Sequence, residues 1–438
     1  MGNISVVESI DCLSLDLLRT LSREKYPSGN MLVSPLSITS ALAMVYLGAR
    51  GDTAAQMEKA LSYTRVIDVH AELKKLIEDI NSPSYNLKTA NRLYGDKTEK
   101  FLSAYHEDVR KYYKADLKIV DFIGATEASR KEINTWVEQQ TGNKIKDILK
   151  PGTVSAEMKL VLVNAIYLKA DWMNRFYKVD TKDMYFKVSQ TESKPVQMMF
   201  QKKNLPYNYI PDHALQILEL PYEKEVLSMF ILLPEESTDG SDPLLKLEKE
   251  LTKKRLEEWT DKRNMSVNAD VHVHLPKFKL EENYELKELL SDLGMTKVFR
   301  KSEADLSGMS NGKIFLSEVA HKAFVEVNEE GTEAAAVTAN VMVGCCGPSE
   351  RKDLLFTADH PFLFFIRHNK TKTILFLGRI SSPQKGDRQQ PCLVPLWSEK
   401  YSEIRPFVLT AAMGVEYRTL IHLQKVGPIP NFSRAAKR

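Results

Sequence analysis

The chain has 438 residues, of which 43% are hydrophobic and 27% are charged. That length can bury a large core or form two or three domains, and the composition is typical of a globular protein rather than a fibrous or disordered one. The formal net charge is +3, and the excess of Lys and Arg lies in residues 384–438. The preceding chain is slightly acidic, which argues against nucleic acid as a partner of the main body.

The cysteines give no disulfide framework. Only Cys12, Cys345, Cys346 and Cys392 occur, and a bridge between two adjacent cysteines is strained. The N-terminus lacks a basic stretch followed by an apolar run, and no apolar run is long enough to span a bilayer. We therefore expect a cytoplasmic protein in a reducing compartment, with no membrane partner.

The first third of the chain carries helical signals. Apolar residues follow helical spacing over 10–21. Ser34 followed by Pro35 is a cap with a proline at the first helical position, and Thr53 with Gln56 three residues later forms the pattern of a capping box. Each pattern predicts the start of a helix.

The middle and the end of the chain are rich in strand signals. Residues 160–168 are almost continuously apolar, as in a central strand that is covered on both faces. Apolar and polar residues alternate over 269–275, and two apolar runs, 362–367 and 373–377, flank a polar turn. Helices first and then strands without strict alternation predict an α+β fold in one large domain.

Common catalytic signatures are absent. The sequence contains no GxSxG, GxxxxGK[ST], GxGxxG, HExxH or CxxC pattern, so an enzyme is disfavoured. His272 and His274 would share one face of a strand, but no third metal ligand is evident, and we expect neither a metal nor a cofactor. Arg50-Gly51-Asp52 is interpreted as a plain turn.

The segment after the strand-like residues 323–327 is unusual. It supplies a glycine and then a run of small residues before the cysteine pair. A segment that must enter the middle of a sheet needs one face without charge. Every second residue from Thr332 meets this requirement, while Glu333 falls on the opposite face. The uncharged residues are Ala334, Ala336, Thr338, Asn340, Met342 and Gly344.

The stretch 329–336 resembles the hinge of inhibitory serpins, and specifically that of the intracellular ovalbumin-like clade. Other motifs of the serpin family agree with it over residues 1–383. They are found at 30–38, 162–172, 304–310, 359–366 and Gly378-Arg379. The resemblance implies a serpin domain over 1–383, with three β-sheets, eight or nine helices and an exposed reactive-centre loop. Residues 384–438 have no counterpart in the family, and we expect a disordered extension or an atypical end of the gene model rather than a second domain.

The same resemblance implies suicide inhibition of serine proteases, with Cys345 and Cys346 flanking the reactive bond. Met342, Val343 and Gly344 before it suggest an elastase-like or chymotrypsin-like target. Arg351 leaves a trypsin-like target open, and a non-inhibitory serpin with a storage or chaperone role is the main alternative. We expect a monomer whose partners are target proteases.

Two groups of residues carry the mechanism in the family. The hinge corresponds to Glu329, Glu330, Gly331, Thr332, Glu333, Ala334, Ala335 and Ala336. The shutter, a polar contact beneath the opening sheet, corresponds to Ser34, Ser37, Asn164 and His321. Hydrogen bonds in the shutter are expected to set how readily the sheet opens.

Overall fold

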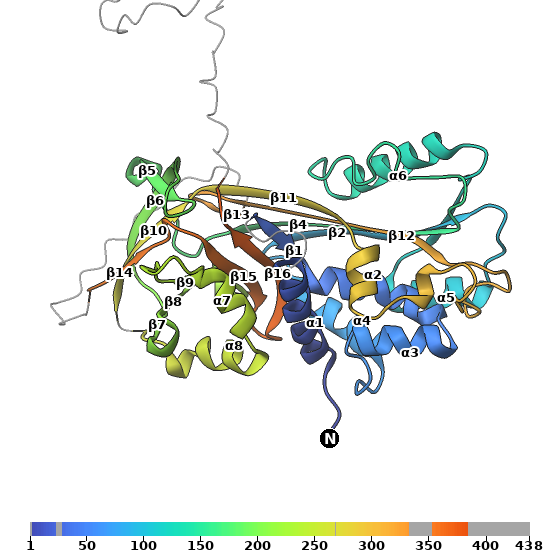
Figure 1. Cartoon of the computed structure of the whole chain (residues 1–438), viewed down its shortest axis with the longest axis horizontal. Coiled ribbons are helices and arrows are strands. Elements are labelled where there is room, and N and C mark those ends of the chain that lie inside the picture. The colour runs from blue at the N-terminus through green and yellow to red at the C-terminus, as the bar shows by residue number, and fades with distance from the viewer. Residues whose placement is uncertain (1, 23–28, 268, 333–352, 384–438) are drawn as a thin grey trace, which may run out of the picture. The chain divides into compact units, whose positions relative to one another are not determined.

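The structure is a computed structural model that describes residues 2–22, 29–267, 269–332 and 353–383. Within these ranges the chain forms nine α-helices and three β-sheets (Figure 1), which confirms the predicted α+β class. The α-helices are α1 (Val6–Thr20), α2 (Pro35–Gly48), α3 (Gly51–Ala60), α4 (Val69–Ile80), α5 (Ser103–Tyr113), α6 (Thr126–Gln140), α7 (Pro243–Glu250), α8 (Lys253–Trp259) and α9 (Lys287–Asp292). Short 3-10 helices are η2 (Lys178–Asp180), η3 (Pro211–His213), η4 (Glu223–Glu225), η5 (Lys262–Asn264) and η6 (Lys297–Phe299).

The sheet that matters most for function has the strand order β11-β12-β13-β4-β2-β3. Its strands are β2 (Asn86–Asp96), β3 (Leu117–Val120), β4 (Leu160–Asp171), β11 (Phe278–Glu285), β12 (Leu316–Val327) and β13 (Gly331–Thr332). Away from the short β13, where nothing lies between them, strands β12 and β4 pair directly and in parallel. We call this the long sheet.

Two further sheets complete the architecture. One has the order β1-β16-β15-β9-β8-β7, and the other has the order β14-β10-β6-β5. The first contains β1 (Met31–Val33), β7 (Tyr207–Ile210), β8 (Leu215–Pro221), β9 (Leu227–Pro234), β15 (Phe362–His368) and β16 (Thr373–Ile380). The second contains β5 (Lys182–Lys187), β6 (Ser193–Asn204), β10 (Asp270–Pro276) and β14 (Asp353–Thr357).

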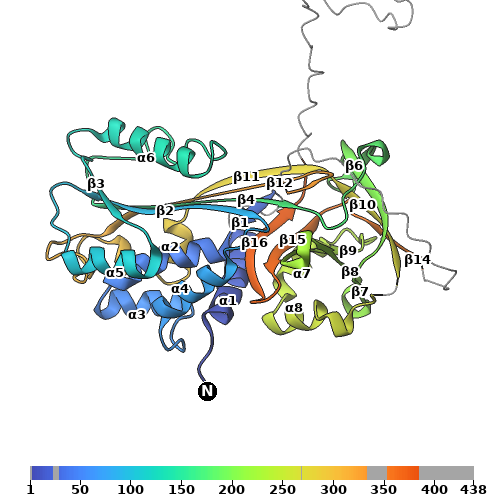
Figure 2. The same cartoon turned by 180° about the vertical axis from the view of Figure 1, so that it is seen from behind.

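The long sheet is covered on both faces. Helix α6 lies on one face, while α2 and α4 lie on the other (Figures 1 and 2). Apolar side chains of β4 alternate between the two layers: Val161 and Val163 pack with the α6 side, and Leu160 and Leu162 pack with the main core. This double coverage explains the nearly continuous apolar run of β4.

Several local predictions are confirmed. The Ser34 hydroxyl accepts a hydrogen bond from the Ser37 N–H at the start of α2, with Pro35 at the first helical position. Strand β10 alternates between buried and half-buried residues. Strands β15 and β16 form the predicted antiparallel hairpin. No helix in the described part of the chain is long and apolar enough to cross a membrane.

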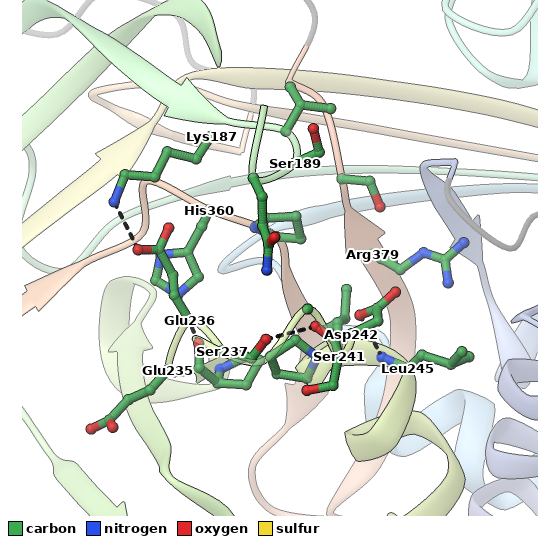
Figure 3. Close-up of a pocket in the computed structure, with 18 of the residues that line it drawn as sticks. Lys187, Ser189, Glu235, Glu236, Ser237, Ser241, Asp242, Leu245, His360 and Arg379 are labelled. Carbon is green, nitrogen blue, oxygen red and sulfur yellow. Dashed lines mark hydrogen bonds and ion pairs between the residues drawn. The ribbon is translucent and has the colours of Figure 1, made fainter. Parts of the chain in front are cut away.

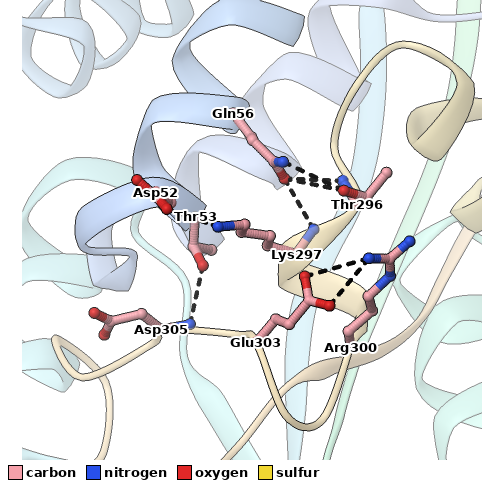
Figure 4. A network of polar contacts seen from close by, with 8 residues as sticks. All are labelled: Asp52, Thr53, Gln56, Thr296, Lys297, Arg300, Glu303 and Asp305. Carbon is pink, nitrogen blue, oxygen red and sulfur yellow. Dashed lines mark hydrogen bonds and ion pairs between the residues drawn. The ribbon is translucent and has the colours of Figure 1, made fainter.

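The capping box predicted at Thr53 and Gln56 is wrong. Helix α3 already begins at Gly51, and no side chain caps its N-terminus. The two side chains instead bind a distant segment (Figure 4): Thr53 Oγ1 accepts from the Asp305 N–H at 2.9 Å, and Gln56 Oε1 accepts from the Lys297 N–H at 2.8 Å. The same side-chain oxygens can accept from backbone N–H groups at the start of their own helix or from those of a distant segment. Sequence spacing alone could not distinguish these two possibilities.

Candidate functional site

The start of the predicted bait loop is already part of the long sheet. After β12 ends at Val327, the chain turns and returns as β13, whose Thr332 pairs with Val327 on one side and with Ala170 of β4 on the other. The Thr332 side chain is fully buried. Two residues of the hinge therefore occupy the end of the gap between β12 and β4.

Gly331 has no room for a side chain. A Cβ atom placed on it would lie 2.2 Å from the Ala170 carbonyl oxygen and 2.7 Å from the Asp171 Cα. Its φ of +153° is also one that residues with side chains rarely adopt. Glycine is required here because the backbones of β13 and β4 approach each other closely.

Two stacked aromatic residues, one directly after β4 and one directly after β8, contact the hinge. Trp172 stacks on Tyr222, with ring centroids 4.5 Å apart and planes 16° apart. The Tyr222 hydroxyl lies 2.8 Å from Thr332 Oγ1, and Trp172 Nε1 donates to the Asn328 carbonyl at 3.0 Å. Both rings are buried. The turn and the first inserted residue are thus tied to one aromatic pair.

A buried carboxylate anchors the turn. Glu329 is only 3% exposed, and its oxygens lie 2.9 Å from Thr181 Oγ1 and 3.1 Å from Lys277 Nζ. Burial acts to raise the pKa of Glu329, but hydrogen bonds from its own backbone, Lys277 and Thr181 hold the pKa below the usual value of 4.5. The carboxylate therefore stays charged and fixed, while the partly exposed pair of Glu330 with Lys178 at 3.6 Å is loose.

The predicted shutter residues meet beneath the middle of the long sheet. His321 of β12 and Asn164 of β4 are register partners, and His321 Nδ1 hydrogen-bonds the Asn164 side-chain oxygen. His321 Nε2 accepts from the Ser34 N–H at 3.2 Å, and Asn164 Nδ2 donates to Ser37 Oγ at 2.6 Å. Three side chains and the Ser34 backbone N–H thus join β4 and β12 to the N-terminus of α2.

These contacts fix the state of the histidine. Because Nε2 accepts a hydrogen bond, the ring proton of neutral His321 must lie on Nδ1, which donates to Asn164. Burial lowers the pKa of His321 to about 3, so the ring is neutral at ordinary pH. The sequence-based interpretation missed Asn91, which continues the row on β2 and accepts from Asn164. A lone amide in the middle of a strand was the available signal.

The other predicted site residues lie outside the described residues. This applies to the hinge residues after Thr332, to the residues suggested to set specificity and to both sides of the reactive bond. They are Glu333, Ala334, Ala335, Ala336, Met342, Val343, Gly344, Cys345, Cys346 and the alternative Arg351.

A pocket of about 660 Å³ lies between β5, β6, α7 and the start of β15 (Figure 3). Two of its lining residues are engaged by neighbouring groups: Lys187 pairs with Glu236 at 2.8 Å, and His360 contacts the Pro234 carbonyl at 2.7 Å and Asp359 at 2.8 Å. With both ring nitrogens of His360 engaged, this histidine has no free nitrogen to activate the serines in the pocket.

No group of three or more possible metal ligands occurs in the described residues. His272 and His274 lie on β10, where His272 Nε2 is 3.6 Å from Asp353. Arg50-Gly51-Asp52 does not form the predicted plain turn: Arg50 is the N-cap of α3, Gly51 and Asp52 lie in its first turn, all three residues are exposed, and Asp52 pairs with Lys297 at 2.6 Å.

Comparison with known proteins agrees with this arrangement. The family model described as "Serpin (serine protease inhibitor)" matches residues 8–383. The chain is a serpin. Leukocyte elastase inhibitors from Equus caballus and Homo sapiens are each 51% identical to it, over 84% of this serpin and 97% of theirs.

Solved structures agree on the fold. Uncleaved ovalbumin matches this serpin with a TM-score of 0.78 and 34% identity, covering 87% of this serpin and 100% of ovalbumin. Maspin matches with a TM-score of 0.77 and 35% identity, covering 86% and 100%. The predicted serpin fold with three sheets is therefore confirmed, and the protein is a protease inhibitor by family, not an enzyme.

Proposed function

We propose that this serpin is a suicide inhibitor of elastase-like or chymotrypsin-like serine proteases, and that the bond between Cys345 and Cys346 is its bait. The observation that carries the proposal is the position of Thr332, paired on both sides in the gap between β4 and β12. A loop that starts there can continue into the sheet after it is cut. Relatives named leukocyte elastase inhibitor support the choice of protease.

The proposed reaction follows the serine protease mechanism as far as the acyl-enzyme. The protease serine Oγ attacks the carbonyl carbon of Cys345, and an ester forms as the peptide bond to Cys346 breaks. The new amine of Cys346 leaves with a proton from the protease histidine. Water has not yet entered, so the protease remains covalently attached while the loop inserts.

Insertion is favoured by the hydrogen-bond count of the sheet. Parting β4 from β12 breaks the parallel ladder that pairs Leu160–Tyr167 with Leu316–Phe324. A strand placed between them forms two antiparallel ladders, which are slightly more stable per residue than a parallel one. The uncharged face of the loop from Thr332 to Gly344 can be buried during this step without stranding a charge.

The remaining parts of the proposal concern partners and place. Target serine proteases are the expected partners, and the protein acts as a cytoplasmic monomer that binds neither nucleic acid nor membrane. Residues Met342, Val343 and Gly344 set the preference for medium apolar groups before the cut. A non-inhibitory role is disfavoured because the hinge carries Thr332 and small alanines instead of charged or bulky residues.

The proposal is tested by whether the protein forms a covalent complex with a target protease. Incubation with a neutrophil-type elastase should give a band that survives denaturing electrophoresis, together with a released peptide that starts at Cys346. Elastase whose active serine has been blocked should give no such band. Two variants separate the possible cleavage sites: Cys345→Glu should abolish complex formation with elastase, whereas Arg351→Ala should leave it unchanged. A peptide that starts at Lys352, or a complex only with trypsin, would move the reactive bond to Arg351.

A further inference from the structure

Two buried hydroxyl groups meet at the first inserted residue. Tyr222 and Thr332 are 1% and 0% exposed, and their hydroxyl oxygens lie 2.8 Å apart. Within the described residues, this is the hydrogen bond that the Thr332 hydroxyl makes. A buried hydroxyl left without a partner is costly, so each of these groups depends on the other.

The position of Tyr222 is fixed by contacts other than its hydroxyl. The residue follows β8, its N–H donates to the Leu227 carbonyl at 3.0 Å, and its ring stacks on Trp172 at the end of β4. The Trp172 N–H donates to the Glu330 carbonyl at 2.8 Å. The Tyr222 hydroxyl is therefore a fixed polar group at the place where β13 ends.

We propose that Tyr222 is a positioning residue for loop insertion: its hydroxyl holds Thr332 paired between β4 and β12 before the bait loop is cut. Insertion then extends β13, which is already paired with its neighbours. The position of Thr332 sets the register of the inserting loop. The inference rests on the proposed function but adds a residue that lies far from the bait in sequence.

The proposal has a kinetic consequence. After acylation, insertion competes with hydrolysis, and the ratio of cleaved to complexed inhibitor reports that competition. Without the Tyr222 hydroxyl, the buried Thr332 hydroxyl loses its partner, and the hinge is held less well in the gap. The free-energy cost of losing this hydrogen bond corresponds to roughly a three- to tenfold change in an equilibrium or a rate. The cleaved-to-complexed ratio should rise by the same factor.

The test is a double-mutant cycle on the full-length protein. Tyr222→Phe and Thr332→Val should each raise the ratio of cleaved to complexed inhibitor roughly three- to tenfold. The double variant should be no worse than either single variant, because removing both hydroxyls leaves no unpaired group. Tyr105→Phe is the matched control, since Tyr105 is equally buried and donates to the Met44 carbonyl at 2.6 Å away from the hinge. It should lower thermal stability without changing the ratio.

A second measurement needs no protease. Synthetic peptides of residues 332–344 and 334–344 are added to the uncut protein, and their incorporation is followed by the gain in melting temperature. In the parent, the protein's own Thr332 already occupies its position between β4 and β12. The extra residues of the longer peptide therefore find no free position there, and both peptides should incorporate at similar rates. In Tyr222→Phe the hinge is held less well, and a longer peptide that carries Thr332→Val, so that no hydroxyl is left unpaired, should gain roughly three- to tenfold over the shorter.

The two proposals fail in different ways. If the parent forms no covalent complex with any serine protease, the proposed function is wrong, and the peptide rates alone decide the role of Tyr222. If the parent forms the complex but the single variants keep its ratio, or if the peptide rates do not change in Tyr222→Phe, then Tyr222 does not position the hinge.

Discussion

Gly331 lies where the chain turns into the long sheet, and the carbonyl of Ala170 occupies the space that a side chain would need. We expect Gly331→Ala to push β13 out of the gap, because the clash involves backbone atoms that cannot rotate away. The variant should still be cut by the target protease but should form much less covalent complex. The measurement is the complexed fraction on a denaturing gel.

Gly294→Ala is the matched control for this prediction. Gly294 also has a positive φ, +103°, but a Cβ atom there would contact nothing within 4 Å. Gly294→Ala therefore introduces backbone strain from the positive φ, but no steric clash of the new methyl group. Should both variants lose complex formation to the same extent, general destabilisation would explain the result and the close approach at Gly331 would not.

His321 gives a pH dependence with a definite sign. Its pKa is about 3 in the folded protein, whereas an unfolded histidine has a pKa near 6.5. Between these values only the unfolded state takes up the proton, so this stabilisation is complete above pH 6.5 and is lost as pH falls toward 3. The expected loss is about 1.4 kcal/mol per pH unit. His321→Gln removes this contribution.

The melting temperature of the uncut parent should therefore fall more steeply between pH 6.5 and 4 than that of His321→Gln. Carboxylates contribute equally to both proteins, so the difference isolates the histidine. Above pH 7 the two proteins should have the same pH dependence, which serves as the internal control. Parallel curves across the acid range would mean that His321 is not buried as a neutral ring.

At the scale of elements, the inserting strand can be tested by charge placement. Thr332→Arg puts a cation into the gap between β4 and β12, where Thr332 is fully buried. An unpaired buried charge costs several kcal/mol, and about 1.4 kcal/mol changes a rate tenfold. The variant should be cleaved as a substrate, with many more inhibitor molecules consumed for each protease inactivated.

Glu333→Arg is the control, since the alternation of the loop sends this side chain to the other face, although Glu333 lies outside the described residues. That variant should remain an inhibitor. Thr332 is already buried before cleavage, so the arginine acts on the resting hinge as well as on insertion. If Thr332→Arg inhibits as well as the parent, loop insertion is not the mechanism.

Local patterns predicted the elements well where the cause is local. The Ser34 cap, the alternation of β10 and the hairpin of β15 and β16 all follow from neighbouring residues. Contacts between distant segments could not be read in this way. Thr53 and Gln56 satisfy backbone groups some 240 residues away, and Tyr222 reaches Thr332 across 110 residues. Family motifs predicted the hinge and shutter residues but did not indicate that Thr332 is already paired.

At the scale of the whole domain, the predicted hinge and shutter residues contact the same two strands. Thr332 pairs at the end of β4, beside Ala170, and Asn164 and His321 join β4 to β12 six positions earlier along β4. At about 3.3 Å per residue this separation is roughly 20 Å. A loop that inserts as proposed must break these contacts on its way, so we predict that their strength and the insertion rate are coupled.

The extent of the domain gives the last prediction. Strand β16 ends at Ile380, and the Asn30 side chain accepts from the Ser381 and Ser382 N–H groups at 2.8 and 3.0 Å. The family match also ends at residue 383. A protein truncated after Pro383 retains all of these contacts.

We expect this truncation to leave both inhibition and melting temperature nearly unchanged. A truncation after Gly378 is the matched control, because it removes Arg379, whose guanidinium is 2.9 Å from the buried Glu248 carboxylate. Both side chains are at most 2% exposed, and loss of one partner from such a pair typically costs 3–5 kcal/mol. The shorter protein should therefore melt at a clearly lower temperature or fail to fold. If removal of residues 384–438 alone lowers the melting temperature by a similar amount, the extension is part of the folded domain.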